Sequence, residues 1–189
     1  MVGNTPNYTK TDVLRCFLRL NTAASRNTLA KELELGEGTV RTILSILKEK
    51  ELLHSSKKGH IVSRKGKNAF EKISACINEC KRVKFDRIYP ELKKFGIVLP
   101  KKKVRNNYRL RDIAVKNGAE GALILEFDGR LTTPEEREIV NYKELENEFK
   151  LNNNDILILA FADSYRNAEN GAFAIAVEIA DEIKGILER

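Results

Sequence analysis

Apolar residues near the start of this chain recur at helical spacing and predict a cluster of three helices. Thr9 can cap the first helix, because Asp12 follows three residues later, where the helix dipole favours a carboxylate. Ser25 can cap a short second helix, which the glycines of LGEG end. A third helix is predicted over about residues 39–51. Its apolar positions follow the one-sided i, i+3, i+4, i+7 pattern and are Val40, Ile43, Leu44 and Leu47.

The opposite face of this third helix is cationic and carries short side chains. Helical spacing brings Arg41, Thr42, Ser45 and Lys48 together there. Short hydroxyl side chains allow a helix backbone to approach a groove closely, and Arg and Lys supply contacts to base edges and phosphates. The pattern therefore favours nucleic-acid binding. Two alternatives stay open: a solvated helix face, and a related domain that binds only protein.

Two short extended runs follow, LLHSS and HIVS, around a tip of Lys57, Lys58 and Gly59, which predicts a β-hairpin. Three helices followed by a hairpin is the order of a winged helix-turn-helix domain, in which the third helix enters the major groove and the hairpin reaches the backbone or minor groove. The candidate DNA-binding residues are Arg26, Asn27, Thr39, Arg41, Thr42, Ser45, Lys48, Lys57, Lys58 and His60.

A fourth helix is predicted from Ser63, as its cap, to about residue 84. Its broad apolar stripe includes Cys76 and Cys80 and is wide enough to pack on a second copy of the chain, so we expect a homodimer. No CxxC or HxxxH spacing supports a metal site, and the three cysteines, Cys16 included, are interpreted as small core residues. We place the domain boundary after this helix, giving domains 1–84 and 85–189.

The second domain alternates strands and helices. GIVL and GALILEF are predicted strands, separated by the helix YRLRDIAVK with Gly118 as its C-terminal cap, and DG is a hairpin turn into RLTT. Thr133, Pro134 and Glu136 predict a helix start, and this helix continues past Leu145. ILILAFA is apolar on both faces and is predicted to be a central strand, followed by one helix that runs to the C-terminus.

The predicted fold class is therefore α/β (α+β), a winged helix-turn-helix domain followed by a small mixed α/β sandwich domain. Charge is segregated between the parts. Residues 1–83 carry 16 Lys and Arg against 8 Asp and Glu, residues 84–116 carry 11 against 3, and residues 117–189 carry 7 against 16. A basic first half suits an anionic partner, although charged surfaces are often merely solvated.

Several classes of function lack sequence support. No apolar run is long enough to cross a membrane, and the N-terminus has no signal-peptide pattern, so a cytoplasmic location is expected. Neither GxGxxG nor GxxxxGK[ST] nor GxSxG occurs, so we expect no cofactor and no enzyme activity. An enzyme that uses Asp163, Tyr165 and Glu169 stays as a minor alternative.

The second domain also has polar residues that could bind a small anionic effector. Asp163, Tyr165 and Arg166 follow the central strand, where open α/β sheets place ligands. Guanidinium groups match carboxylates and phosphates with paired hydrogen bonds. The candidate effector-binding residues are Arg105, Arg109, Arg111, Asp112, Asp163, Tyr165 and Arg166. Alternatively, DSYRN is only a capped turn and the arginines are solvated.

The segment SRNTLAKELELGEGTVRTILSILKEKELLHSSKKGHIVSRKG resembles the winged-helix domains of prokaryotic regulators. The segment RLRDIAVKNGAEGALIL with DGRLTTP resembles the C-terminal domain of a group of archaeal winged-helix proteins, a domain with no assigned role. The positions that match are Arg111, Asp112, Ala114, Gly118, Ala119, Gly121 and Ala122. The resemblance implies a transcriptional regulator that binds double-stranded DNA, and it names no effector and no operator.

Overall fold

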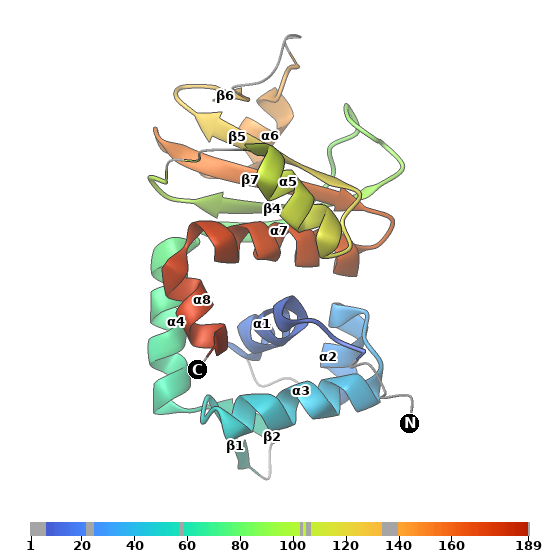
Figure 1. Cartoon of the computed structure of the whole chain (residues 1–189), viewed down its shortest axis with the longest axis vertical. Helices are drawn as coiled ribbons and strands as arrows, with labels where there is room; N and C mark the ends of the chain where they lie inside the picture. Colours follow the sequence, from blue (N-terminus) through green and yellow to red (C-terminus); the bar gives the residue numbers. More distant parts are fainter. Residues whose placement is uncertain are drawn as a thin grey trace. The chain divides into compact units, whose positions relative to one another are not determined.

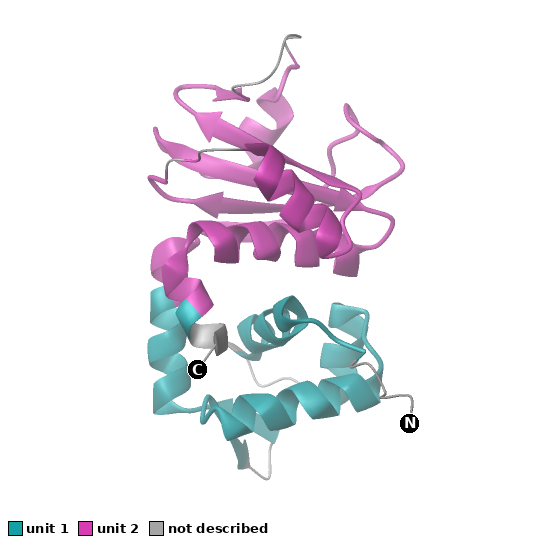
Figure 2. Cartoon of the chain, in the orientation of Figure 1, with its two compact units in different colours: residues 1–72, 185–189 teal, residues 73–184 magenta. Residues whose placement is uncertain are grey.

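The computed structural model describes residues 7–21, 25–56, 59–102, 104, 107–133 and 140–188. Two compact units divide the chain, and Figure 2 colours them teal and magenta. The N-terminal unit comprises Met1–Lys72 with Gly185–Arg189, and the C-terminal unit comprises Ile73–Lys184. The division after residue 72 precedes the boundary expected at residue 84.

Helices and one small hairpin make up the N-terminal unit (Figure 1). The predicted order of three helices and a hairpin is confirmed. Strand β1 pairs antiparallel with β2, from Leu53 opposite Val62 to Ser56 opposite Gly59. The elements are α1 (Lys10–Leu18), the 3-10 helix η1 (Arg19–Asn21), α2 (Arg26–Leu33), α3 (Glu37–Glu49), β1 (Leu53–Ser56) and β2 (Gly59–Val62), with α4 (Arg64–Cys76) following the hairpin.

Side-chain caps begin three of these helices, as the sequence predicts. Thr9 accepts a hydrogen bond from the Asp12 amide, and the Asp12 carboxylate accepts one from the Thr9 amide in return. Ser25 accepts from the Thr28 amide at 3.1 Å, and Ser63 accepts from the Gly66 amide at 2.9 Å. The caps fix where α1, α2 and α4 begin.

A fully buried ion pair within α1 is also hydrogen-bonded to α2. Arg15 Nη1 donates to Asp12 Oδ1 at 2.8 Å, and Nη2 donates to the Leu33 carbonyl at 3.2 Å. Neither charged side chain is exposed to solvent. Because two buried charges satisfy each other and a helix-end carbonyl, the pair fixes the arrangement of the two helices that α3 packs against.

The predicted long fourth helix is wrong beyond its first half. Helix α4 ends at Cys76, and residues 79–83 form strand β3 (Glu79–Val83). Apolar residues at 76, 77, 80 and 83 fit helical spacing, but strand β4 offers an open edge, and the Asn78 amide already donates to the Val98 carbonyl at 2.9 Å. Cys80 is consequently exposed on β3 and is not a core residue, in contrast to Cys16 and Cys76.

The C-terminal unit is built on a five-stranded sheet in the order β3-β4-β7-β5-β6, with every pairing antiparallel. ILILAFA lies in the central strand as predicted, and all eight residues of that strand are buried. The predicted mixed α/β character of this part of the chain is confirmed. Besides β3, the strands are β4 (Lys93–Leu99), β5 (Gly121–Phe127), β6 (Leu131–Thr132) and β7 (Asp155–Ala162).

Two helices, α5 (Asn107–Lys116) and α7 (Tyr165–Ile179), pack together and against one face of this sheet (Figure 1). A Cβ on Gly171 of α7 would lie 2.5 Å from the Ala119 Cβ, so the glycine permits close packing there. Gly118 has φ +98 after α5, as expected for its capping role. The predicted single C-terminal helix is interrupted at Ala180, where φ is −115, and α8 (Asp181–Glu188) follows.

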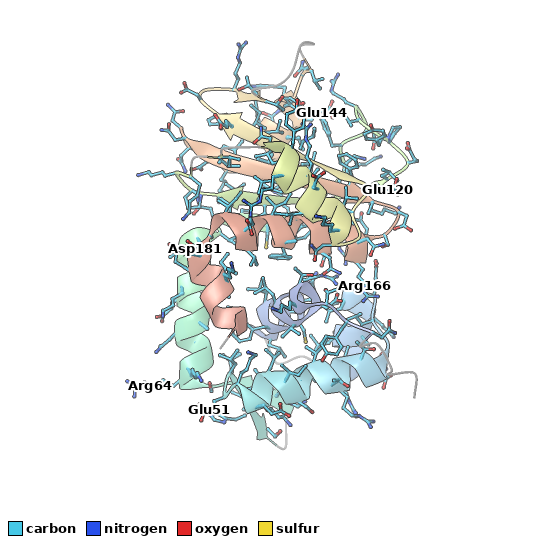
Figure 3. The ribbon with its side chains drawn as sticks, in the orientation of Figure 1. Glu51, Arg64, Glu120, Glu144, Arg166 and Asp181 are labelled. Carbon is cyan, nitrogen blue, oxygen red and sulfur yellow. The ribbon has the colours of Figure 1, made fainter. Side chains whose placement is uncertain are left out.

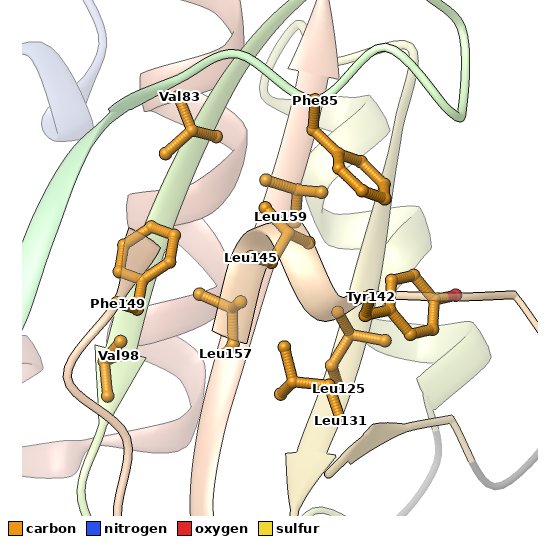
Figure 4. Packing of buried hydrophobic residues seen from close by; sticks show 10 residues of the cluster. All are labelled: Val83, Phe85, Val98, Leu125, Leu131, Tyr142, Leu145, Phe149, Leu157 and Leu159. Carbon is orange, nitrogen blue, oxygen red and sulfur yellow. The ribbon is translucent and has the colours of Figure 1, made fainter. Parts of the chain in front are cut away.

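The other face of the sheet buries a second apolar layer (Figure 4). Phe149 packs so closely on β4 that a Cβ on Gly96 would lie 2.3 Å from its ring. Helix α6 (Lys143–Glu148) contributes Leu145 to this layer. The predicted helix start at Pro134 and Glu136 lies outside the described residues. The cluster consists of Val83, Phe85, Val98, Leu125, Leu131, Tyr142, Leu145, Phe149, Leu157 and Leu159.

In the part of the chain that the structure describes, no helix has the length and apolar character needed to cross a membrane.

Substituting Arg15 by Met tests the buried ion pair. We expect the free energy of unfolding to fall by about 3–5 kcal/mol, because the Asp12 charge would be left buried without its guanidinium partner. Urea unfolding followed by circular dichroism measures the change. Lys10→Met, on the exposed side of the same helix, should change it by less than about 0.5 kcal/mol. Equal losses for the two variants would contradict this account.

Candidate nucleic-acid interface

Helix α3 divides into a buried face and an exposed face, as its sequence predicts. Val40, Ile43, Leu44 and Leu47 are all buried, with at most 2% of any side chain exposed. The opposite face is open to solvent at the four predicted positions, and Thr39 is half-buried beside it. The exposed residues are Arg41, Thr42, Ser45 and Lys48.

The hydroxyl-bearing side chains on this face are short enough for a nucleic-acid groove to fit against the helix. Thr42 donates its hydroxyl to the Gly38 carbonyl at 3.2 Å, one turn earlier, so its side chain lies along the helix. Ser45, one turn further on, is equally short and exposed. A flat strip thus runs between the long side chains of Arg41 and Lys48, and a base edge could approach it closely.

Charged residues of α2 and α3 affect the pKa of His60 on β2. Burial lowers the pKa of His60 below its usual value, and the positive charges of Lys48 and Arg26 lower it further. Arg26 and its neighbour Asn27 are exposed in the first turn of α2. The positive charges of Arg26 in the first turn of α2 and Lys48 near the end of α3 therefore both act on His60 of the hairpin. The predicted hairpin-tip residues Lys57 and Lys58 lie outside the described residues.

One acidic residue on this surface was overlooked in the sequence pattern. Helix α3 begins at Glu37, two residues before the predicted start, with Gly36 as a cap that makes no side-chain hydrogen bond. An exposed carboxylate in the first turn weakens the attraction of the helix N-terminus for phosphate. The cationic character of α3 therefore resides in its middle and last turns, at Arg41 and Lys48.

The predicted effector residues do not form one cluster. Arg109 on α5 forms an ion pair with Glu178 near the end of α7, whereas Asp163 precedes the start of α7 and accepts a hydrogen bond from Asn167 at 3.1 Å. Residues 165 and 178 of one helix are separated by about 20 Å at 1.5 Å per residue. Because the sheet is entirely antiparallel, it also lacks the switch point at which parallel sheets place ligands.

The remaining predicted residues have other surroundings. The Arg82 guanidinium lies over the Tyr165 ring, 4.3 Å from the ring centroid. Arg166 follows Tyr165 in the first turn of α7 (Figure 3). Arg111 lies 5.8 Å from the Tyr108 ring, and its neighbour Asp112 is exposed. Arg105 lies outside the described residues.

An ion pair at the start of α7 was missed by the sequence analysis. Arg82 Nε donates to Glu169 Oε1 at 3.0 Å, and the Glu169 side chain is fully buried. Arg82 could not be found because residues 79–83 were assigned to a helix. A glutamate among the alanines of α7 was the available signal. Within the described residues, no group of three or more His, Cys, Asp or Glu side chains could hold a metal ion.

A groove of ≈ 530 Å³ lies beside β5 in the C-terminal unit. Tyr89 stacks on Phe161 at one wall, with ring centroids 5.0 Å apart. Buried Lys94 holds this wall, because its Nζ donates to the Tyr89 and Leu92 carbonyls at 2.7 and 2.9 Å. Burial lowers the pKa of Lys94. Arg111 and Val115 of α5 also line the groove.

Two parts of the chain match known protein families. Residues 9–68 match the family described as "PH0730-like, N-terminal domain", and residues 93–179 match "Domain of unknown function (DUF4443)". The chain is similar to a solved structure described as "Hypothetical protein PH0730 from Pyrococcus horikoshii OT3". The TM-score is 0.78 at 29% identity, over 96% of this chain and 98% of that chain. No curated protein matches.

The Lys48→Ala variant tests whether α3 and the hairpin share one cationic surface. We expect the pKa of His60 to rise toward its usual value, because removing a nearby positive charge stabilises the imidazolium. A pH titration of the His60 imidazole by NMR measures it, with the His54→Gln variant assigning the two histidine signals. Lys116→Ala in the C-terminal unit should leave the pKa unchanged. An unchanged pKa in Lys48→Ala would contradict the shared surface.

Proposed function

We propose that the chain is a sequence-specific DNA-binding transcriptional regulator whose N-terminal unit is a winged helix-turn-helix domain. In this proposal α3 enters the major groove, and the β1–β2 hairpin is the wing. The main support is the exposed face of α3, where cationic and short hydroxyl side chains stand opposite a fully buried apolar face. The match of residues 9–68 to the N-terminal domain family is consistent with a separate domain of this extent.

Each side chain of the proposed interface has a distinct part in recognition. Arg41 and Lys48 are long enough to reach guanine edges or phosphates from the exposed face of α3. Thr42 and Ser45 allow the backbone to approach and can accept or donate hydrogen bonds to bases. Thr39 is half-buried one turn before Ile43, and it would contact the DNA backbone at the edge of the major groove.

Phosphate contacts come from the residues around α3. Arg26 and Asn27 lie in the first turn of α2, where backbone amide groups also point outward. His60 is close enough to Lys48 and Arg26 to respond to both charges, so one phosphate could be shared among the three. By sequence, Lys57 and Lys58 belong to the wing and complete the proposed set.

The C-terminal unit, in this proposal, dimerises the regulator or senses a small anionic effector. The groove beside β5 is the feature that supports a ligand, because it combines the Arg111 guanidinium with apolar walls. Arg109, Asp163, Tyr165 and Arg166 do not line that groove and are not included in the proposed ligand site.

Salt dependence of DNA binding tests the electrostatic part of the proposal. If a dimer neutralises about six phosphates, the logarithm of the association constant should fall with the logarithm of salt concentration at a slope near −5, from about 0.9 per contact. Fluorescence anisotropy with a genomic fragment retained by the purified full-length protein measures the slope. A slope near zero would reject DNA binding through this surface.

Single substitutions separate base contacts from phosphate contacts. Lys48→Ala should reduce the slope by about 1 for each bound protomer, and Arg41→Ala should cost about 1–3 kcal/mol on the preferred sequence and relax sequence preference. Lys116→Ala, which removes one positive charge from an exposed helix of the other unit, is the matched control and should leave both quantities near wild type. If all three variants bind DNA equally well, an interaction adaptor is the better description.

A further inference from the structure

The two edges of the C-terminal sheet differ in their chemistry. The edge strand β3 carries Glu79, Lys81 and Arg82, and such charged side chains discourage an edge strand from pairing with another chain. On the opposite side, the described residues pair with the outer edge of β5 only at Glu126 and Phe127, through β6. Residues 121–125 of β5 have the sequence GALIL, with neither charge nor proline, so this stretch can accept another strand.

Helix α5 presents an exposed stripe beside this strand. Tyr108, Arg111, Asp112 and Val115 recur at i, i+3, i+4 and i+7, so they share one face. Tyr108 is 66% exposed and Val115 is 51% exposed, while Leu110 and Ala114 point into the core. Large exposed apolar side chains next to a strand edge that the described residues leave open are typical of a surface that binds protein.

Apolar exposure is concentrated in this region of the molecule. Among the described residues, four large hydrophobic side chains are exposed, and three of them lie on α5 or in the adjoining groove: Tyr89, Tyr108 and Val115. Because Arg111 and Val115 line the groove together with Leu123 of β5, the stripe and the strand edge form one continuous surface.

The stripe is complementary to a second copy of itself. If two α5 helices run antiparallel about a two-fold axis between residues 111 and 112, the Arg111 guanidinium meets the carboxylate of Asp112 from the second copy. The same axis places Tyr108 against Val115 of the second copy, an aromatic side chain on an aliphatic one. Each contact occurs twice by symmetry, so opposite charges meet at the centre and apolar groups meet at both ends.

We infer that α5 and the open edge of β5 form a two-fold interface with a second copy of this chain. The antiparallel β5 strands of the two copies pair along residues 121–125, which joins the two sheets, and the α5 stripes pack over the junction. Arg111 and Asp112 act here as partner-selecting residues, so the dimer takes the place of an effector at Arg111 and is the first of the two alternatives proposed for the C-terminal unit.

This interface differs from the one expected from the fourth helix. Five of the seven apolar residues of that predicted stripe, Ala69, Ile73, Cys76, Ile77 and Val83, are at most 9% exposed, while Phe70 is half-buried and only Cys80 is exposed. They therefore offer no large apolar face to a second copy, whereas α5 does.

The dimer extends the proposed function, because it would supply two copies of α3. Its contacts lie in the C-terminal unit, and dimerisation is measured without DNA. Sedimentation equilibrium of the full-length wild-type protein should give a dimer at micromolar concentration. A wild-type protein that stays monomeric at high micromolar concentration overturns the inference and leaves the DNA proposal standing.

Charge reversal tests the central contact. Arg111→Asp brings two carboxylates together across the axis, and Asp112→Arg brings two guanidinium groups together. Because symmetry doubles each change, we expect either variant to weaken dimerisation by about tenfold or more. The double variant R111D/D112R restores opposite charges and should return the dimerisation constant to within about threefold of wild type. Failure of the double variant to recover overturns the proposed axis.

Val115→Glu gives a test that is independent of contacts that Arg111 makes within its own chain. A carboxylate at this exposed position should leave the far-ultraviolet circular dichroism spectrum unchanged and make the protein monomeric. Lys116→Glu, at the neighbouring exposed position off the stripe, is the matched control and should remain dimeric. A dimer that survives Val115→Glu with unchanged affinity shows that a different surface mediates association and overturns the inference.

Discussion

Burial of the central strand on both faces is the constraint on which the C-terminal unit depends. All eight residues of β7 are buried, so this strand needs a backbone partner at each edge and an apolar layer over each face. Strands β4 and β5 supply the edges, and α7 with α5 covers one face. The outer edges then have to be protected in turn. Charges protect β3, whereas β6 pairs with only two residues of β5.

In the N-terminal unit, by contrast, α3 is packed against other helices on one side only. Helices α1 and α2 both pack on α3, and Arg15 fixes these two helices by bridging Asp12 and the Leu33 carbonyl inside the core. With its apolar residues covered on that side, α3 leaves Arg41 and Lys48 in solvent. The buried pair therefore contributes to the proposed interface without touching it, by setting the support on which the exposed face rests.

Local signals in the sequence were sufficient where the structure is decided locally. The caps of three helices and the apolar run of β7 were identified because neighbouring residues determine them. Residues 79–83 were misassigned, since their spacing fits a helix and the competing partner, β4, is remote in sequence. The same limit hid the pair of Arg82 with Glu169 and the antiparallel order that separates Arg109 from Asp163. Those contacts depend on how strands that are remote in sequence pair in the sheet.

The two-fold axis of the proposed dimer connects it with the proposed DNA-binding function. Exposed ion pairs contribute only about 0–1 kcal/mol each, so the Arg111 and Asp112 contacts would select the register of the dimer while strand pairing and apolar burial supply most of its stability. Two copies of α3 held in the proposed dimer would bind a two-fold DNA site as linked modules, and the second contact would then benefit from a high effective concentration. A modest number of cations on each α3 would therefore be enough for the proposed specific binding, provided that the β5 edges pair.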